Sequence, residues 1–167
     1  MNDPAAAPGG ADEKRVLGWR EWVALPDLGI EQIKAKVDTG ARTSALHAFR
    51  VDTEETADGL QVRFAVHPDQ RDEERVTWCV APVVDRRVVR DSGGHEEERI
   101  VILTQVAVAG RSWPIEMTLT SRDNMGFRML LGRTAIRGAF VVDPARSYVQ
   151  GKRRRPRGTR IASEDRA

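Results

Sequence analysis

The chain has 167 residues, enough for one domain with a hydrophobic core and too few for several large ones. Its 27 basic and 25 acidic residues nearly balance, at a formal net charge of +2. The lone cysteine, Cys79, excludes an intrachain disulfide and gives no mark of an oxidising compartment. Neither a signal sequence nor an apolar run of membrane-spanning length is present, so we expect a soluble, cytoplasmic protein.

Three regions are expected along the chain. Residues 1–15, rich in Ala, Pro, Gly and charge, predict a disordered leader, residues 16–149 a folded domain, and residues 150–167 a basic disordered tail. Within residues 151–167, seven Lys or Arg stand against Glu164 and Asp165, so the basicity belongs to the tail and the body is net acidic. Such a tail is either a solvated end or an arm for a polyanionic partner, such as nucleic acid or a ribosomal surface.

Short alternating or β-branched segments recur between turn signals, a spacing typical of an all-β barrel. One short helix is expected, over residues 132–137, and the last ordered element over residues 147–149. Trp19, Trp22, Trp78 and Trp113 are expected in the core or at its rim, and Cys79 as a small buried hydrophobe. The expected strands are residues 19–25, 32–37, 45–51, 60–66, 75–80, 83–90, 98–108, 113–119, 129–131 and 140–142.

The segment Val37-Asp38-Thr39-Gly40-Ala41-Arg42-Thr43-Ser44 places a carboxylate at the end of an alternating strand, in a tight turn. Aspartic proteases present their catalytic acid in this way. Gly40 would let the backbone approach the carboxylate and take dihedrals that other residues avoid. An Asp followed by Gly also marks ordinary turns, so this motif alone is weak. A second segment, Met129-Leu130-Leu131-Gly132-Arg133-Thr134, strengthens the assignment, because an apolar run closed by Gly-Arg supports such a loop in retropepsin-like lobes.

With both segments in place, the chain resembles a retropepsin-like aspartic protease lobe, which is a closed β-barrel with one short helix. More narrowly, it resembles the bacterial RimB-like family, known as ATP-dependent zinc proteases and associated with RimK-type glutamate ligases. Gly18 to Pro26, Ile33 to Ala48, Gly94 to Arg99 and Met129 to Thr134 carry this resemblance. It implies catalysis by Asp38, Thr39 and Gly40, with Leu131, Gly132 and Arg133 supporting the loop or the dimer.

The resemblance also assigns a flap, a mobile hairpin over substrate, to residues 84–101. Its tip, with Ser92, Gly93, Gly94 and His95, would contact substrate together with Ala41 and Arg42. His47 is either a substrate-contacting group or a histidine bonded within the sheet. Residues 51–82 exceed the minimal lobe and predict an added hairpin of unknown role.

Asp91-Ser92-Gly93 is a second Asp-Ser-Gly, but Arg90 before it and Gly94 after it favour a hairpin turn. Two carboxylates held about 3 Å apart share one proton and can then act as base and acid, which a lone Asp cannot do. The second Asp must therefore come from another copy of the chain, and we expect a homodimer.

The family label refers to zinc and ATP, but the sequence contains no motif that matches either. No His-Glu-x-x-His is present, and His47, His67, His95 and Cys79 lack ligand spacing, so we expect no metal and no cofactor. The predicted function is peptide-bond hydrolysis by an Asp-activated water. The expected substrate is a peptide or a polyglutamate-tailed protein, and a RimK-type ligase is a candidate partner. The alternatives are a non-catalytic binding or dimerisation module of the same fold, or a zinc protease as the label states.

Overall fold

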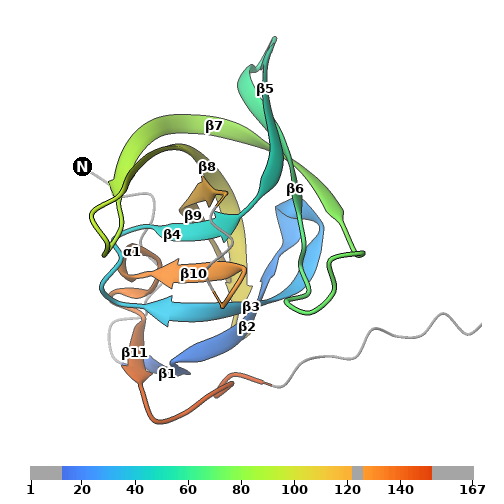
Figure 1. Ribbon diagram of the computed structural model, residues 1–167. Helices are drawn as coiled ribbons and strands as arrows, with labels where there is room; N and C mark the ends of the chain where they lie inside the picture. Colours follow the sequence, from blue (N-terminus) through green and yellow to red (C-terminus); the bar gives the residue numbers. More distant parts are fainter. Residues whose placement is uncertain (1–12, 122–125, 152–167) are drawn as a thin grey trace, which may run out of the picture.

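A computed structural model describes residues 13–121 and 126–151. Most of the predictions about the leader and the tail therefore lie outside the described residues. The alternating segments pair into a nine-stranded sheet in the order β2-β3-β10-β4-β9-β8-β7-β6-β5 and a two-stranded sheet of β1 and β11 (Figure 1). The strands are β1 Arg15–Gly18, β2 Arg20–Leu25, β3 Ile30–Asp38, β4 Ser44–His47, β5 Phe49–Thr56, β6 Gly59–Val66, β7 Thr77–Arg90, β8 Glu96–Val108, β9 Arg111–Thr120, β10 Met129–Gly132 and β11 Phe140–Asp143. The 3-10 helix η1 spans Pro26–Leu28 and the helix α1 spans Arg133–Ile136.

The mostly β architecture and the short helix agree with the sequence prediction. Apolar residues of β2, β3, β6, β8, β9 and β10 alternate inward and form one core. Ile33, Leu46, Ile102, Met117 and Leu131 are fully buried in it. One antiparallel pairing, Ala24 with Ala107, also joins β2 to β8. β2 thus pairs with β3 and, at this single position, with β8, while β7, β6 and β5 continue the sheet beyond β8.

Two predicted boundaries are wrong where a strand changes neighbours. The expected strand over residues 45–51 is two strands, because β4 pairs with β9 and β10 whereas β5 pairs with β6. Conversely, the two strands expected on either side of Pro82 are one strand, β7. Figure 1 shows β7 arching from β6 to β8. Its ladder shifts from β6 to β8 at Pro82 and Val83, where a missing backbone N–H is tolerated.

Other expectations are confirmed or corrected by burial. The surplus over residues 51–82 is largely the β5–β6 hairpin, as predicted, although it also takes in the first part of β7. Cys79 is 2% exposed and Trp113 is 3% exposed, as expected. Trp78 is 45% exposed, so its assignment to the core or rim was wrong. Residues 147–149 form no strand, and β1 was not predicted. Among the residues described, no helix is long and apolar enough to span a membrane.

Candidate active site

Asp38 ends β3 at the start of a tight loop, and the loop holds its carboxylate from one side. The backbone N–H groups of Gly40 and Ala41 donate to Asp38 Oδ1 at 3.0 and 3.1 Å. Oδ2 accepts no hydrogen bond within residues 13–121 and 126–151. Asp38 is half-buried. One carboxylate oxygen is thus fixed by two backbone donors, and the other is not used by the described part of the chain.

The reason for glycine at position 40 is close approach. A Cβ added there would lie 3.3 Å from Asp38 Oδ1, tighter than ordinary contact. Gly40 has no positive φ, since the positive-φ glycines are at other positions. The expected approach of backbone to carboxylate is therefore confirmed, and the expected unusual dihedral is wrong.

The second motif lies directly against this loop, because β10 runs between β3 and β4. Leu131 and Gly132 pair with Val37 and Asp38 in parallel, and Leu130 pairs with Ala45 in the antiparallel direction. The two strands that flank the Asp38 loop are thus separated by the distant segment. Leu131 and Gly132 therefore lie against the strand that carries Asp38, and their supporting role stays a prediction.

Gly132 is in the tightest position of this arrangement. An added Cβ would lie 2.6 Å from the Thr43 carbonyl carbon and 2.8 Å from the Ser44 nitrogen. The Gly132 N–H donates to Ser44 Oγ at 3.0 Å, which fixes the start of β4. Only glycine lets β10 come this close to the loop backbone.

Arg133 and Thr134 hold the other carbonyls of the loop. The Arg133 guanidinium donates to the Gly40 carbonyl at 3.1 Å, and its backbone N–H donates to the Ala41 carbonyl at 2.8 Å. Thr134 Oγ1 donates to the Arg42 carbonyl at 2.7 Å. Arg133 therefore braces the loop of its own chain.

Thr39 and Arg42 are the exposed side chains of this loop. The Arg42 carbonyl accepts from Thr134, whereas the Arg42 guanidinium forms no ion pair among the described residues. The loop that carries Asp38 thus also presents an exposed hydroxyl and an exposed cation.

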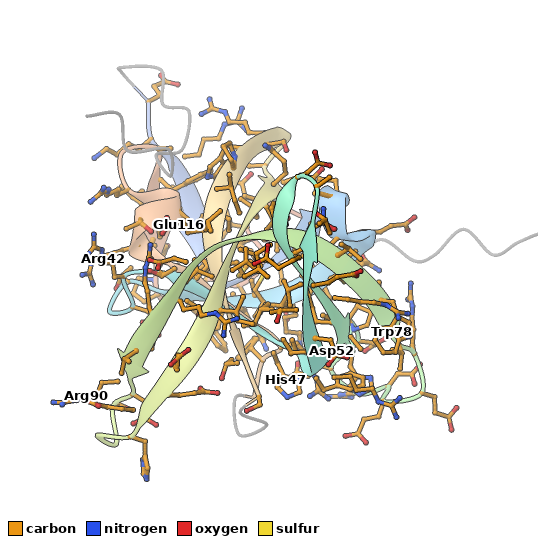
Figure 2. The ribbon with its side chains drawn as sticks, turned by 90° about the horizontal axis from the view of Figure 1, so that it is seen from above. Arg42, His47, Asp52, Trp78, Arg90 and Glu116 are labelled. Carbon is orange, nitrogen blue, oxygen red and sulfur yellow. The ribbon has the colours of Figure 1, made fainter. Side chains whose placement is uncertain are left out.

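The expected flap is a hairpin of β7 and β8, paired from Val83 with Ile102 to Arg90 with Glu96. Its tip, with Ser92, Gly93, Gly94 and His95, is a turn in which Asp91 Oδ1 accepts the His95 N–H at 2.8 Å. Asp91 therefore lies in a hairpin turn, as predicted. The tip lies on the same side of the molecule as the Asp38 loop (Figure 1), and Figure 2 shows Arg90 and Arg42 at one side.

Charged pairs tie this hairpin to β9. Arg87 donates to both carboxylate oxygens of Glu116, at 2.8 and 3.2 Å, and also to Asp85. The hydrogen bonds that Arg87 donates to Glu116, and then to Asp85, raise the pKa of Arg87, and the hydrogen bond from Arg87 lowers the pKa of Asp85. The base of the hairpin is held in place, whereas its tip extends beyond these pairs.

A second set of contacts links the hairpin to the Asp38 loop. Arg99, on β8, pairs with Glu97 at 3.0 Å and donates to Thr118 Oγ1 at 3.4 Å. Thr118 Oγ1 in turn donates to the Ser44 carbonyl at 3.2 Å. The sequence did not predict these contacts, because the residues meet only when β4, β9 and β8 lie side by side.

His47 lies at the opposite end of β4 from the loop. It is 7% exposed, and its backbone N–H donates to the Arg128 carbonyl at 2.8 Å. Figure 2 places it away from Arg42. The structure therefore does not bring His47 together with Asp38, which favours the histidine bonded within the sheet.

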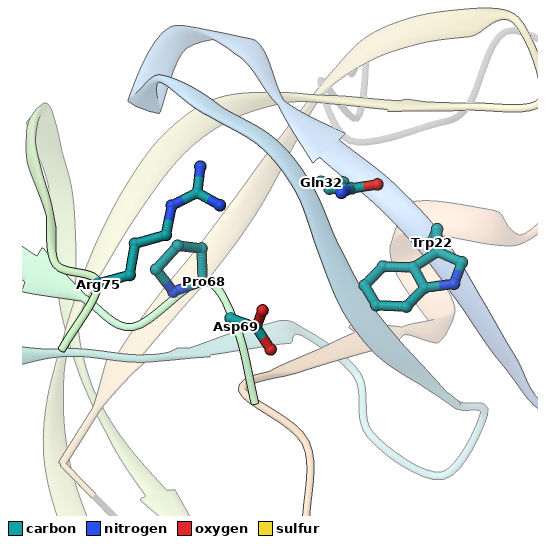
Figure 3. Close-up of a pocket in the computed structure, with 5 residues that line it drawn as sticks. All are labelled: Trp22, Gln32, Pro68, Asp69 and Arg75. Atoms are coloured by element: carbon teal, nitrogen blue, oxygen red, sulfur yellow. The ribbon is translucent and has the colours of Figure 1, made fainter. Parts of the chain in front are cut away.

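A separate hollow lies between the loop of residues 67–76 and β2 and β3. Figure 3 shows Pro68, Asp69 and Arg75 on one side, with Trp22 and Gln32 on the other. Its volume is about 10 Å³, room for about one water molecule. Within residues 13–121 and 126–151, no three His, Cys, Asp or Glu side chains group as metal ligands would.

One residue of the resemblance has a structural role that the sequence did not reveal. Glu21, in Gly-Trp-Arg-Glu-Trp, is 0% exposed. Its carboxylate accepts backbone N–H bonds from Gly18 at 2.6 Å, Val149 at 3.0 Å and Gln150 at 2.9 Å. It thereby ties the C-terminal part of the described chain to the start of the sheet.

Comparison with known proteins agrees with this geometry. The sequence profile of a family described as retropepsin-like aspartic endopeptidase RimB matches residues 16–153. A Shewanella pealeana protein named "Probable alpha-L-glutamate ligase" is 42% identical over 143 residues, covering 86% of this chain and 31% of that protein. A Parasynechococcus marenigrum protein of the same name is 46% identical over 138 residues, covering 83% of this chain and 30% of that one. The chain thus spans about a third of the length of these curated relatives.

A solved structure has the same fold. A crystal structure of a Legionella pneumophila protein of unknown function has a TM-score of 0.70 and is 25% identical. The match covers 83% of this chain and 99% of that one. Together with the family profile, which spans the described β sheet and both segments of the Asp38 site, this shows that the chain belongs to the RimB-like family of retropepsin-like aspartic endopeptidases.

Proposed function

We propose that this chain is one half of an aspartic endopeptidase, active as a homodimer in which two copies of Asp38 face each other. The two carboxylates would share a proton, because both cannot ionise at such short range. The ionised one takes a proton from water as the water oxygen attacks the peptide carbonyl carbon. Proton transfer to the amine nitrogen then lets the C–N bond break.

The proposal rests on the Asp38 carboxylate, of which the loop binds one oxygen and not the other. Two backbone N–H groups fix Oδ1, which orients the group without using Oδ2. β10 and Arg133 hold the loop rigid from behind, so little reorganisation is needed on reaction. The Thr39 side chain is exposed and has no hydrogen-bond partner among the described residues of one chain, in keeping with a bond across a two-fold axis to the loop of the second copy.

The rest of the fold suits this role. The six strands β2, β3, β10, β4, β9 and β8, with the pairing of Ala24 and Ala107, would act as the closed barrel of a retropepsin lobe. The β7–β8 hairpin would act as the flap, with its tip, residues 91–95, over the substrate. Closing such a hairpin excludes water from the reacting groups.

For the substrate, we propose a chain of glutamates added by a RimK-type ligase. The support is twofold. The relatives are named glutamate ligases and contain this domain as about a third of their length. Arg42, four residues after Asp38 in the same loop, also presents an exposed guanidinium that forms no ion pair among the described residues. A guanidinium binds carboxylates in a bidentate manner, so an acidic side chain beside the scissile bond would be favoured.

The test compares Asp38→Asn with Asp91→Asn, a matched change in the Asp91-Ser92-Gly93 segment. Purified proteins are incubated with a glutamate-tailed peptide and with a neutral peptide of equal length, and products are identified by mass spectrometry. We expect Asp38→Asn to abolish cleavage and Asp91→Asn to retain it. Specific activity should fall on dilution, because the site needs two chains. Full activity of folded Asp38→Asn would refute the aspartic mechanism, and activity restored by zinc after chelation would favour the metal alternative.

A further inference from the structure

A gap interrupts the hydrogen-bonded ladder along one edge of β8. β9 pairs with one edge of β8 continuously, from Val101 with Thr118 to Val108 with Arg111. The other edge is shared, because β7 pairs with it as far as Ile102 and β2 pairs with it at Ala107. Among the described residues, no strand pairs with residues 103–106 on this edge.

The backbone groups of Leu103 and Gln105 face this gap. Gln105 lies opposite Pro114 in the antiparallel ladder with β9, and Pro114 has no N–H to donate. Opposed residues alternate between hydrogen-bonded and non-hydrogen-bonded pairs, so Gln105 and Leu103 occupy non-hydrogen-bonded positions toward β9. Their N–H and C=O groups therefore point to the other edge. Ala107, two residues further on, meets β2 there, as this alternation requires.

A groove of about 250 Å³ lies at the gap. Leu103, Thr104 and Gln105 line it from β8, Val80 to Pro82 from β7, and Asp27 and Leu28 from η1. The volume is below the range of about 300–1,000 Å³ that is usual for small-molecule pockets. Thr104 is 3% exposed, and its Oγ1 has no hydrogen-bond partner among the described residues.

The rim of the groove is apolar on one side and acidic on another. Val80 is 52% exposed, and Trp78, two residues before it on the same strand, is 45% exposed. Asp27 is exposed and forms no ion pair among the described residues. Figure 2 shows Trp78 on the opposite side of the molecule from Arg42, so this surface is separate from the Asp38 loop.

We propose that this groove binds a short extended peptide segment of a partner protein, which pairs with β8 at Leu103 and Gln105. Unpaired N–H and C=O groups on alternate residues of a sheet edge can form hydrogen bonds with the extended backbone of another chain. An aliphatic side chain of the segment packs on Val80 and Pro82, and a basic residue next to it faces Asp27. The partner segment thus lies along this edge of β8, bordered by β7 and η1, and away from the proposed catalytic loop.

The experiment uses the full chain labelled with ¹⁵N and titrated with acetyl-Lys-Val-Thr-Val-Lys-amide. Saturable shifts of the Leu103 and Gln105 amides and the Trp78 indole are expected below about 1 mM peptide. Val80→Lys should remove them, whereas Val88→Lys should not. Val88 is the matched control, because it is a 64% exposed valine on the same strand and does not line the groove.

Two peptide variants test the chemistry of the site. Replacing the central Thr of the peptide by Pro removes a backbone donor and should abolish binding. Flanking Glu in place of Lys should weaken it, and Asp27→Asn should remove that preference. Absence of shifts at Leu103 and Gln105, equal binding of the Pro peptide, or equal binding by Val80→Lys would overturn the proposal. Shifts confined to residues 38–44 would also overturn it and would point to the catalytic loop.

Discussion

Replacing Glu21 by Gln should destabilise the fold far more than a surface change of the same kind. The Glu21 carboxylate is fully buried and accepts three backbone N–H bonds, from Gly18, Val149 and Gln150. An amide has one oxygen, so at least one N–H would face an NH₂ group and lose its acceptor. The remaining bonds would become neutral.

The magnitude follows from these bonds. Leaving one buried donor unsatisfied costs about 1–3 kcal/mol, and two charge-assisted bonds made neutral lose about 1 kcal/mol each. Relief of the desolvation of a buried charge offsets part of this. We expect Glu21→Gln to lower the free energy of unfolding by about 3 kcal/mol. At about 2–4 °C per kcal/mol, the midpoint of thermal unfolding should fall by about 6–12 °C.

The assay is urea and thermal unfolding followed by circular dichroism, with Glu31→Gln as the control. Glu31 is an exposed residue of β3, and its change to Gln should alter stability by less than about 0.5 kcal/mol. Tryptophan fluorescence adds a local probe, because Tyr148 next to the clamped segment stacks on Trp22 at 5.8 Å. A Glu21→Gln protein as stable as Glu31→Gln would refute the reasoning that this carboxylate clamps the C-terminal segment.

Three further changes have defined outcomes. Gly132→Ala should lose about 2 kcal/mol or more on urea unfolding, because its Cβ would meet the Thr43 carbonyl at 2.6–2.8 Å, whereas Gly126→Ala, with open space around it, should be neutral. Thr104→Val should raise the unfolding free energy by about 1 kcal/mol by removing a buried hydroxyl without a partner, and a loss would contradict its unsatisfied state. Burial raises the pKa of Cys79 to about 11, above its ordinary value of 9.0, so folding stability should fall as pH rises from about 9 to 11. Urea midpoints at pH 8 and 10.5 measure this, and Cys79→Ala should remove that part of the slope.

Local pattern was enough to predict most strands and one half of the site. Asp38, Gly40 and their strand are contiguous, so alternation and turn chemistry locate them directly. Boundaries failed where tertiary pairing decides them. Pro82 signals a break in any isolated strand, yet β7 continues through it because its hydrogen bonds change from β6 to β8 at that point.

The contacts that sequence reasoning missed join residues far apart along the chain. Glu21 meets Val149 and Gln150, 128 and 129 positions later, and Thr118 meets the Ser44 carbonyl over 74 positions. A glutamate between Arg and Trp on an alternating strand gives no signal that it is buried. Only the topology, which brings the C-terminal segment back to β2, turns that residue into a clamp.

The buried polar side chains of this fold differ in whether their hydrogen bonds are satisfied, and this difference bears on the proposed peptide-binding groove. Glu21, Ser44 and Thr118 are buried, and each makes hydrogen bonds that hold a loop or chain segment in place. Thr104 is equally buried, but its hydroxyl has no partner, and it lines the groove where β8 also has an unpaired edge. A buried unsatisfied group costs stability, and valine would fill the same space without that cost. We therefore expect Thr104→Val to stabilise the free protein and to leave the Asp38 loop unchanged. In that case the fold itself does not need the Thr104 hydroxyl or the unpaired edge of β8, and a peptide bound in the groove explains both.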